Sequence, residues 1–308
     1  MLPILAVVAA AVLFGTTGTS QALGPDGTTP LSVGVMRLVI GGTALALIGW
    51  LLARRRRRRT GAPHRRATAR DLALMATTGV CLAAYQPLFF LGTERNGVAV
   101  GTVIALGSAP VLAGILEWAL TRRTPSGTWV LATALATVGV VLLGIGGDAG
   151  ATAGADPLGI LGSVGAGASF AVFANAQRRL MDAGWDPFTV AGAMGAWSAL
   201  VAALALPFVD LSWLAQGPGL AMALWLGIAT IAVAYTLFTW GLERLTAATA
   251  ATLTLAEPLT ASLLGILVLG ERLSALAIVG LVVLAAGLVL LAWGARSPRD
   301  PVPFAVEG

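Results

Sequence analysis

Charged residues are scarce in this sequence: they make up 11% of its 308 residues, while 57% of the residues are hydrophobic. Soluble domains carry about 25% charged residues. The chain also has one cysteine, one histidine and no lysine. Cys81 therefore cannot form an intrachain disulfide, and His64 alone cannot build a histidine-based metal or catalytic cluster. These shortages exclude an ordinary soluble domain and argue against a membrane enzyme. They give no reason to expect a metal or a cofactor.

Apolar runs of about 20 residues recur along the chain, each long enough to cross the membrane as a helix. Membrane β-strands would alternate apolar and polar residues, whereas the segment 276–293 is apolar on every face. We therefore predict an all-α integral membrane protein. Gly, Pro and charged residues divide it into ten transmembrane helices, at 2–22, 30–53, 71–93, 97–120, 126–146, 157–181, 187–209, 217–241, 246–269 and 273–294.

The positions of the arginines predict how these helices are oriented. Positively charged residues stay on the cytoplasmic side of a membrane protein. With both termini inside, 16 of the 19 arginines fall in inner segments, whereas the outer loops hold only Arg95 and Arg272. We expect both termini in the cytoplasm.

Six consecutive arginines at 54–59 have three interpretations: a nucleic-acid patch, a site for anionic lipid, or a topology anchor. The run directly follows a predicted membrane helix, and no aromatic residue is interleaved with it. Its position favours the anchor or the lipid contact, so we expect membrane lipid and no nucleic acid as a partner.

The two halves of the chain share sequence motifs. The pattern Phe-x-x-Gly-x-Glu-Arg occurs at 89–95 and again at 238–244. Chance matching of similar apolar helices is the alternative to a duplication. With five helices per half, a duplication would place the halves in opposite orientations, as in many transporters. We predict repeats at 1–146 and 157–294 and a cytoplasmic tail at 295–308. At an offset of 148 residues, further identities pair Pro110 with Pro258, Gly139 with Gly287, and 141–143 with 289–291.

The stretch Leu-Ala-Glu-Pro-Leu at 255–259, followed by Leu-Gly-Glu-Arg-Leu at 269–273, resembles the second repeat of EamA-type transporters in the drug/metabolite transporter superfamily. Met-Arg-Leu at 36–38 and Ser-Ala-Pro at 108–110 resemble the first repeat. Arg122-Arg123 stands where that family usually has Gly-Glu.

This resemblance implies a secondary transporter of a bacterial inner membrane, an exporter of small metabolites such as amino acids or related amphiphilic compounds, working by alternating access. No G-x-x-x-x-G-K-[ST] motif occurs, so exchange of substrate or protons is the expected source of work. A channel, a non-transporting scaffold and, with least support, an intramembrane enzyme remain alternatives. The oligomeric state stays open between monomer and homodimer.

Three charged residues, Arg37, Glu117 and Glu257, fall clearly inside predicted spans. A charge at that depth costs about 2.5–3.5 kcal/mol on insertion scales, so each needs a partner, a cavity or a route to the surface. Glu117 lies near a helix end, where it can extend to the membrane surface or pair with Arg122 or Arg123. Arg37 either binds a substrate carboxylate, pairs with Glu257 or extends outward.

Glu257 lies midway along its helix, and Pro258 removes the next backbone donor, so we expect helix breaks at Pro258 and at Pro110. The carboxyl group of Glu257 either binds an ammonium group, exchanges protons, or has a purely structural role. If Arg37 and Glu257 face one cavity, they suit a zwitterion. The other candidates for substrate binding or coupling are mid-depth side chains, for which helix packing is the alternative: Tyr85, Gln86, Asn175, Trp197 and Tyr235.

Overall fold

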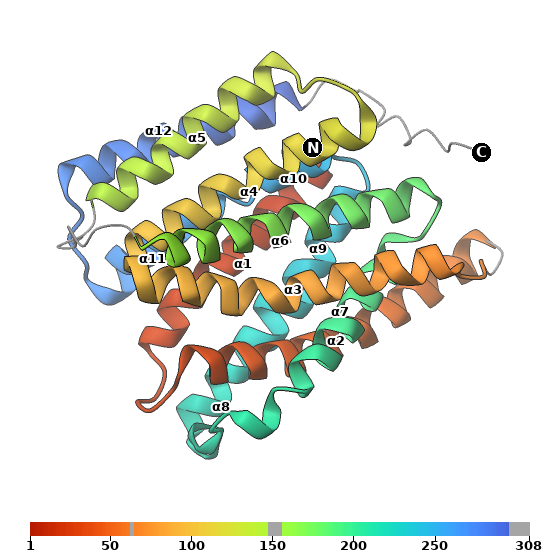
Figure 1. Ribbon diagram of the computed structural model, residues 1–308, viewed down its shortest axis with the longest axis horizontal. Helices are drawn as coiled ribbons and strands as arrows, with labels where there is room; N and C mark the ends of the chain where they lie inside the picture. The colour runs from red at the N-terminus through yellow and green to blue at the C-terminus, as the bar shows by residue number, and fades with distance from the viewer. Residues whose placement is uncertain (62–64, 147–155, 296–308) are drawn as a thin grey trace.

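The computed structural model describes residues 1–61, 65–146 and 156–295, and it confirms the predicted all-α membrane fold (Figure 1). Within these ranges, ten helical spans are long and apolar enough to cross a membrane. Of the predicted tail, only Ala295 lies among the described residues. The helices are α1 Leu2–Ala22, α2 Pro30–Thr60, α3 Ala69–Asn96, α4 Val98–Thr121, α5 Gly127–Gly146, α6 Pro157–Asp182, α7 Pro187–Ala203, α8 Gly217–Leu224, η3 Trp225–Val233, α9 Ala234–Leu242, α10 Ala247–Leu253, α11 Ala256–Leu269 and α12 Ala275–Gly294.

Helix α2 is longer than the sequence predicts. It continues past residue 53 through the whole arginine run and ends at Thr60, and the left-handed backbone of Gly61 (φ 66°) caps it. Arginine is a good helix former, so leaving the hydrocarbon does not by itself end the helix. At 31 residues, and with a rise of about 1.5 Å per residue, α2 is longer than the membrane core is thick. We call the end of the bundle that holds residues 54–59 the arginine-rich end; it lies at the right of Figure 1.

Three of the later spans are irregular. The seventh ends as α7 at Ala203 and is followed by the short 3-10 turns η1 Leu206–Phe208 and η2 Ser212–Ala215. The eighth runs without a gap from α8 through the π-helical segment η3 into α9. The ninth is divided into α10 and α11 by a turn at 254–255.

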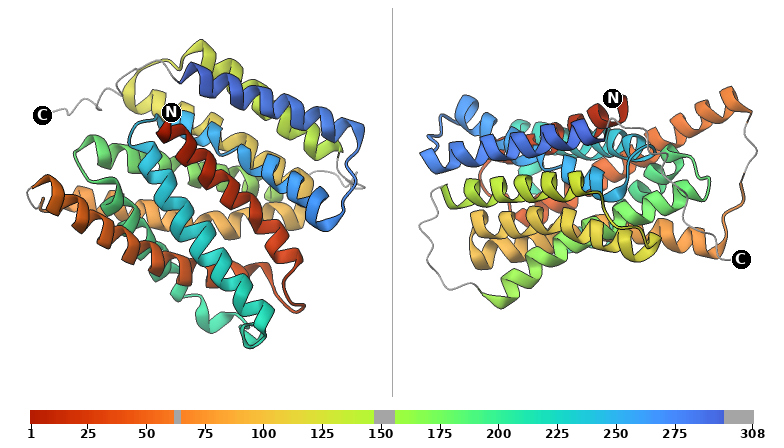
Figure 2. Two further views of the ribbon diagram at one scale, coloured as in Figure 1. Left: turned by 180° about the vertical axis from the view of Figure 1, so that it is seen from behind. Right: turned by 90° about the horizontal axis from the view of Figure 1, so that it is seen from above.

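Packing between the helices follows the internal repeat. Helix α3 packs on α6, and the corresponding pair from the other half, the η3–α9 span and α1, also packs. Two further contacts also occur twice, once for each repeat. Helix α2 packs on η3 as α7 packs on α3, and α4 packs on α6 as α11 packs on α1. The pairs α2–α7, α5–α12 and α4–α10 each join equivalent helices, and Figure 2 shows α5 beside α12 at one edge of the bundle. This pattern is the one expected of two inverted five-helix repeats.

Candidate functional site

Arg37 lies on α2 in the interior of the bundle, with 9% of its surface exposed. Its Nη2 donates a hydrogen bond to the hydroxyl oxygen of Thr230 in η3, at 3.0 Å. Its Nε has no hydrogen-bond partner among the described residues. A buried cation with a vacant donor is costly unless a ligand or another group satisfies it.

The structure brings Glu257, Tyr85 and Tyr235 into electrostatic range of Arg37. These four side chains come from four helices: α2 and α3 in the first repeat, α9 and α11 in the second. We call them the central cluster. Arg37 and Glu257, which come from different repeats, therefore lie in one interior region, close enough to influence each other electrostatically.

A local break in the ninth span places Glu257 at this position. Helix α10 ends at Leu253 and α11 begins at Ala256, so Glu257 and Pro258 lie in the first turn of α11. Proline is tolerated there because the first-turn N–H groups have no partner within the helix. A carboxylate in the same turn is also stabilised by the positive end of the helix dipole.

The expected break at Pro110 is absent, because α4 continues through this residue. A proline inside a membrane helix removes one hydrogen bond, and neighbouring helices can compensate for that loss. Pro110 is also buried against its surroundings. The two proline positions are therefore related by the repeat and differ in local structure.

A π-helical segment positions Thr230. A π-helix shifts the register of the residues that follow, and such segments are frequent at functional sites. Helix α2 approaches η3 closely at a glycine: a Cβ placed on Gly41 would lie 2.5 Å from the carbonyl oxygen of Gly227. This close approach lets Arg37, one turn earlier on α2, reach Thr230.

Aromatic side chains pack around Tyr235 in the interior of the bundle. Tyr235 contacts Phe14 and Phe173, with ring centroids 5.0 and 5.8 Å apart. Phe173 and Phe238 are fully buried, and their rings are 6.1 Å apart. On the other side of the cluster, Tyr85 stacks on Phe89 and is only partly buried. Among these rings, Phe238 lies one helical turn beyond Tyr235 on α9, towards the arginine-rich end.

The remaining candidate site residues, Gln86, Asn175 and Trp197, have different surroundings. Gln86 faces α2 beside Gly34, one helical turn from Arg37. Asn175 is buried and donates to the Ala113 carbonyl of α4 at 3.2 Å, so it links two helices. Trp197 is 36% exposed and lies where α7 packs against α3.

Several polar contacts were not predicted from the sequence. The Thr230 hydroxyl lies in an apolar stretch that carries no motif. Gln177 accepts a hydrogen bond from Thr239 at 2.8 Å inside the bundle. Arg178, one of the arginines assigned to the inner segments, is only 7% exposed and donates to the carbonyls of Leu242 and Glu243 at the end of α9.

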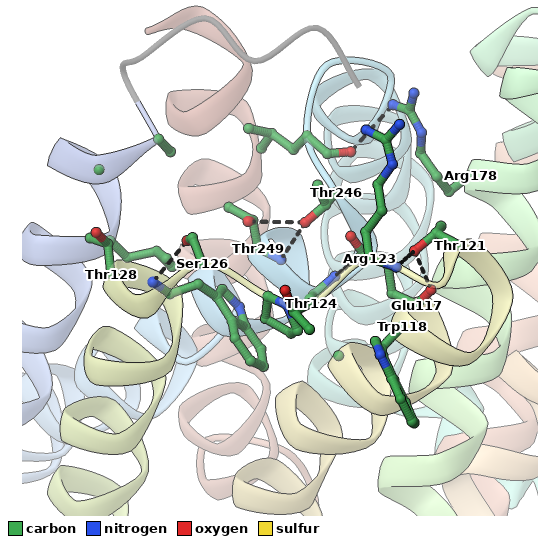
Figure 3. A pocket seen from close by; sticks show the side chains of 18 of the residues that line it. Glu117, Trp118, Thr121, Arg123, Thr124, Ser126, Thr128, Arg178, Thr246 and Thr249 are labelled. Carbon is green, nitrogen blue, oxygen red and sulfur yellow. Dashed lines mark hydrogen bonds between the residues drawn. The ribbon is translucent and has the colours of Figure 1, made fainter. Parts of the chain in front are cut away.

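A pocket of about 360 Å³ opens at the arginine-rich end between α4, α5, α10 and α12 (Figure 3). Glu117 faces it and accepts a hydrogen bond from the backbone N–H of Ala248, at 2.9 Å. This carboxylate therefore caps the first turn of α10, in place of the expected pairing with Arg122 or Arg123. The pocket holds charges of both signs, among them Asp182, Arg178 and Arg244.

Fold and site together define a multi-pass membrane protein with two inverted repeats and a broken helix at its charged centre, an architecture common among membrane transporters. The profile of the EamA-like transporter family matches residues 1–145 and 157–293. The chain belongs to this family and is a membrane transporter.

Two further likenesses agree with this assignment. The chain is 39% identical over 293 residues to the "Uncharacterized transporter YwfM" of Bacillus subtilis (strain 168), covering 95% of this chain and 94% of that protein. A solved structure described as "Crystal structure of protein" superposes with a TM-score of 0.75 at 19% identity. That superposition covers 96% of this chain and 98% of the other, and it shows the shared fold.

Proposed function

We propose that the protein is a secondary transporter that exports small zwitterionic metabolites, amino acids or related amphiphilic compounds, by alternating access. The observation that carries this proposal is the placement of Arg37 and Glu257, from different repeats, in one interior cluster. The vacant Nε of Arg37 suits a substrate carboxylate, and Glu257 suits an ammonium group. Tyr85 and Tyr235 add aromatic surface and a hydroxyl group each.

Glu257 also offers a route for coupling. A carboxyl group at mid-depth that alternately binds an ammonium group and a proton would exchange one for the other as the repeats rock. A proton entering from outside would then drive the solute outward. We propose the proton as the coupling ion on this basis.

The direction of transport depends on the orientation, and we propose that the arginine-rich end faces the cytoplasm of a bacterial cell. The fully buried ring of Phe238, one turn beyond Tyr235 on α9, covers the central cluster on that side. Ion pairs close the same end: Arg56 binds Glu243 at 2.7 Å and Asp186 at 3.4 Å, and these contacts join α2 of the first repeat to the second. Alternating access requires that this end open to admit solute from the cytoplasm.

Counterflow in proteoliposomes tests the proposal. Vesicles preloaded with one unlabelled amino acid should accumulate the same labelled amino acid, and Arg37→Ala and Glu257→Gln should each abolish the accumulation. Glu94→Gln, at the exposed end of α3, also removes a carboxylate but lies outside the site. This variant should still accumulate the labelled amino acid. Transport that survives both central substitutions contradicts the proposed site. Flux without counterflow favours a channel, and no flux for any solute favours a scaffold.

A further inference from the structure

A cavity of about 750 Å³ opens at the arginine-rich end, separate from the central cluster. Helix α2, the residues before α3 and the turn between α6 and α7 form its walls. Four arginines line it, together with two carboxylates and two tryptophans: Arg54, Arg56, Arg57, Arg65, Asp186, Glu243, Trp50 and Trp185.

The charges in this cavity are unequally satisfied. Arg56 binds both lining carboxylates, Asp186 and Glu243. Arg65 donates to the Ala183 carbonyl and lies 3.8 Å from Asp71. Arg54 stacks over the Trp50 ring at 5.3 Å, and no carboxylate among the described residues lies within 4.0 Å of it. The cavity therefore has a positive charge that an anion would neutralise.

The surface that leads to Arg54 is apolar. Leu47, Trp50 and Leu51 follow one another at helical spacing on the same side of α2 as Arg54. They are 58%, 57% and 46% exposed. Helix α2 thus presents an exposed apolar stripe inside the membrane that ends in an arginine at its surface. A ligand that follows this surface needs hydrocarbon chains and an anionic head.

We propose that this cavity binds the phosphate headgroup of an anionic phospholipid, whose acyl chains lie along Leu47 and Leu51. Arg54 and Arg65 contact the phosphate, and Trp50 lies at the boundary between headgroup and hydrocarbon. A free phosphate or a nucleic acid would make no use of the apolar stripe, which is why a lipid fits better. The site is independent of the transported solute.

Binding of single lipids to the detergent-purified protein tests the site, with native mass spectrometry as the readout. Phosphatidylglycerol should bind in preference to phosphatidylcholine. Arg54→Gln should weaken phosphatidylglycerol binding about fivefold, because one charge-assisted contact with the bound phosphate is lost, and Arg54→Gln with Arg65→Gln should weaken it further. Arg59→Gln removes the same charge from the same helix outside the cavity and should leave binding unchanged within twofold.

Three results would overturn the assignment. Equal losses in Arg54→Gln and Arg59→Gln would show that general charge attraction explains the binding. Equal binding of both lipids would remove the role of charge. Glycerol phosphate that competes as well as the intact lipid would show a free-phosphate site. Arg54 and Arg59 are exposed, so the two single variants are expected to fold, and they decide the test without the double variant.

Discussion

Arg122 and Gly270 have the same left-handed backbone conformation, 148 residues apart at equivalent ends of α4 and α11. Their φ and ψ angles are 57° and 19° for Arg122, and 70° and 20° for Gly270. Arg122 is the one residue other than glycine with positive φ in the described part of the chain. The second repeat therefore uses the residue best suited to this conformation, and the first repeat does not.

We expect Arg122→Gly to stabilise the protein by about 1 kcal/mol, because the left-handed conformation costs about 1–2 kcal/mol for a residue with a side chain. Thermal unfolding in detergent would measure the change. Gly270→Arg is the reciprocal control and should destabilise the protein by a similar amount. Shifts of the same sign in both variants would contradict the proposed equivalence.

Gly41→Ala should destabilise the protein by about 1–3 kcal/mol, because its Cβ would lie 2.5 Å from both the Gly227 carbonyl oxygen and the Ile231 Cβ. Moving α2 away from η3 should also disturb the contact between Arg37 and Thr230. Unfolding in detergent measures the first effect. Gly18→Ala in α1 is the control, since a Cβ there meets nothing within 4 Å, and it should be neutral or slightly stabilising. Equal effects of the two substitutions would contradict the close packing.

The ion pair between Arg56 and Glu243 should show a measurable coupling. Both side chains are partly exposed, at 39% and 25%, so we expect a coupling energy of about 0.5–1 kcal/mol in a double-mutant cycle with Arg56→Gln and Glu243→Gln. High salt should reduce it. A coupling of zero at low salt would show that the pair does not help to close the arginine-rich end.

The opposite end of the bundle has its own ion pair, between Arg95 and Asp156 at 3.0 Å. The hydrogen bond from Arg95 lowers the pKa of Asp156, and a bond from the Leu158 N–H adds to this effect. A carboxyl group with a lowered pKa stabilises the folded state at neutral pH, and this contribution is lost as the pH falls through the folded-state value.

Asp156→Asn should therefore reduce the melting temperature at pH 7, and this effect should shrink as the pH falls below about 4, the ordinary value for an aspartate, and through the lowered pKa of Asp156 in the folded protein. The substitution keeps a side-chain oxygen for capping α6, so it isolates the charge. Melting temperatures of both proteins across this pH range would show the difference. An effect independent of pH would show that the charge of Asp156 does not account for it.

Much of the fold is predictable from the sequence, because hydrocarbon imposes simple rules on length and polarity. The ten spans and the duplicated halves follow from apolar runs and from motifs such as the one at 89–95. Helix α2 extends beyond its predicted end because leaving the membrane does not end a helix of arginines. Pro110 and Pro258 show that one residue type gives a continuous helix in one repeat and a break in the other.

The centre is only partly predictable. Arg37, Glu257 and the two tyrosines stand out as polar residues at depth, and the structure brings them together. Thr230 does not stand out, because its contact with Arg37 depends on the π-helical register of η3, for which the sequence carries no known signal. The aromatic packing of Phe14 and Phe173 around Tyr235 arises from three separate helices, so local patterns do not reveal it.

The most direct test of the central claim compares the binding of an amino acid with two analogues, the amine that lacks its carboxylate and the acid that lacks its ammonium group. Titration calorimetry on the purified protein should show that the wild type prefers the zwitterion to both. Arg37→Gln should no longer prefer the zwitterion to the amine, but should still prefer it to the acid. Glu257→Gln should no longer prefer the zwitterion to the acid, but should still prefer it to the amine. If either variant keeps the full preference of the wild type, Arg37 and Glu257 do not recognise the two ends of the solute.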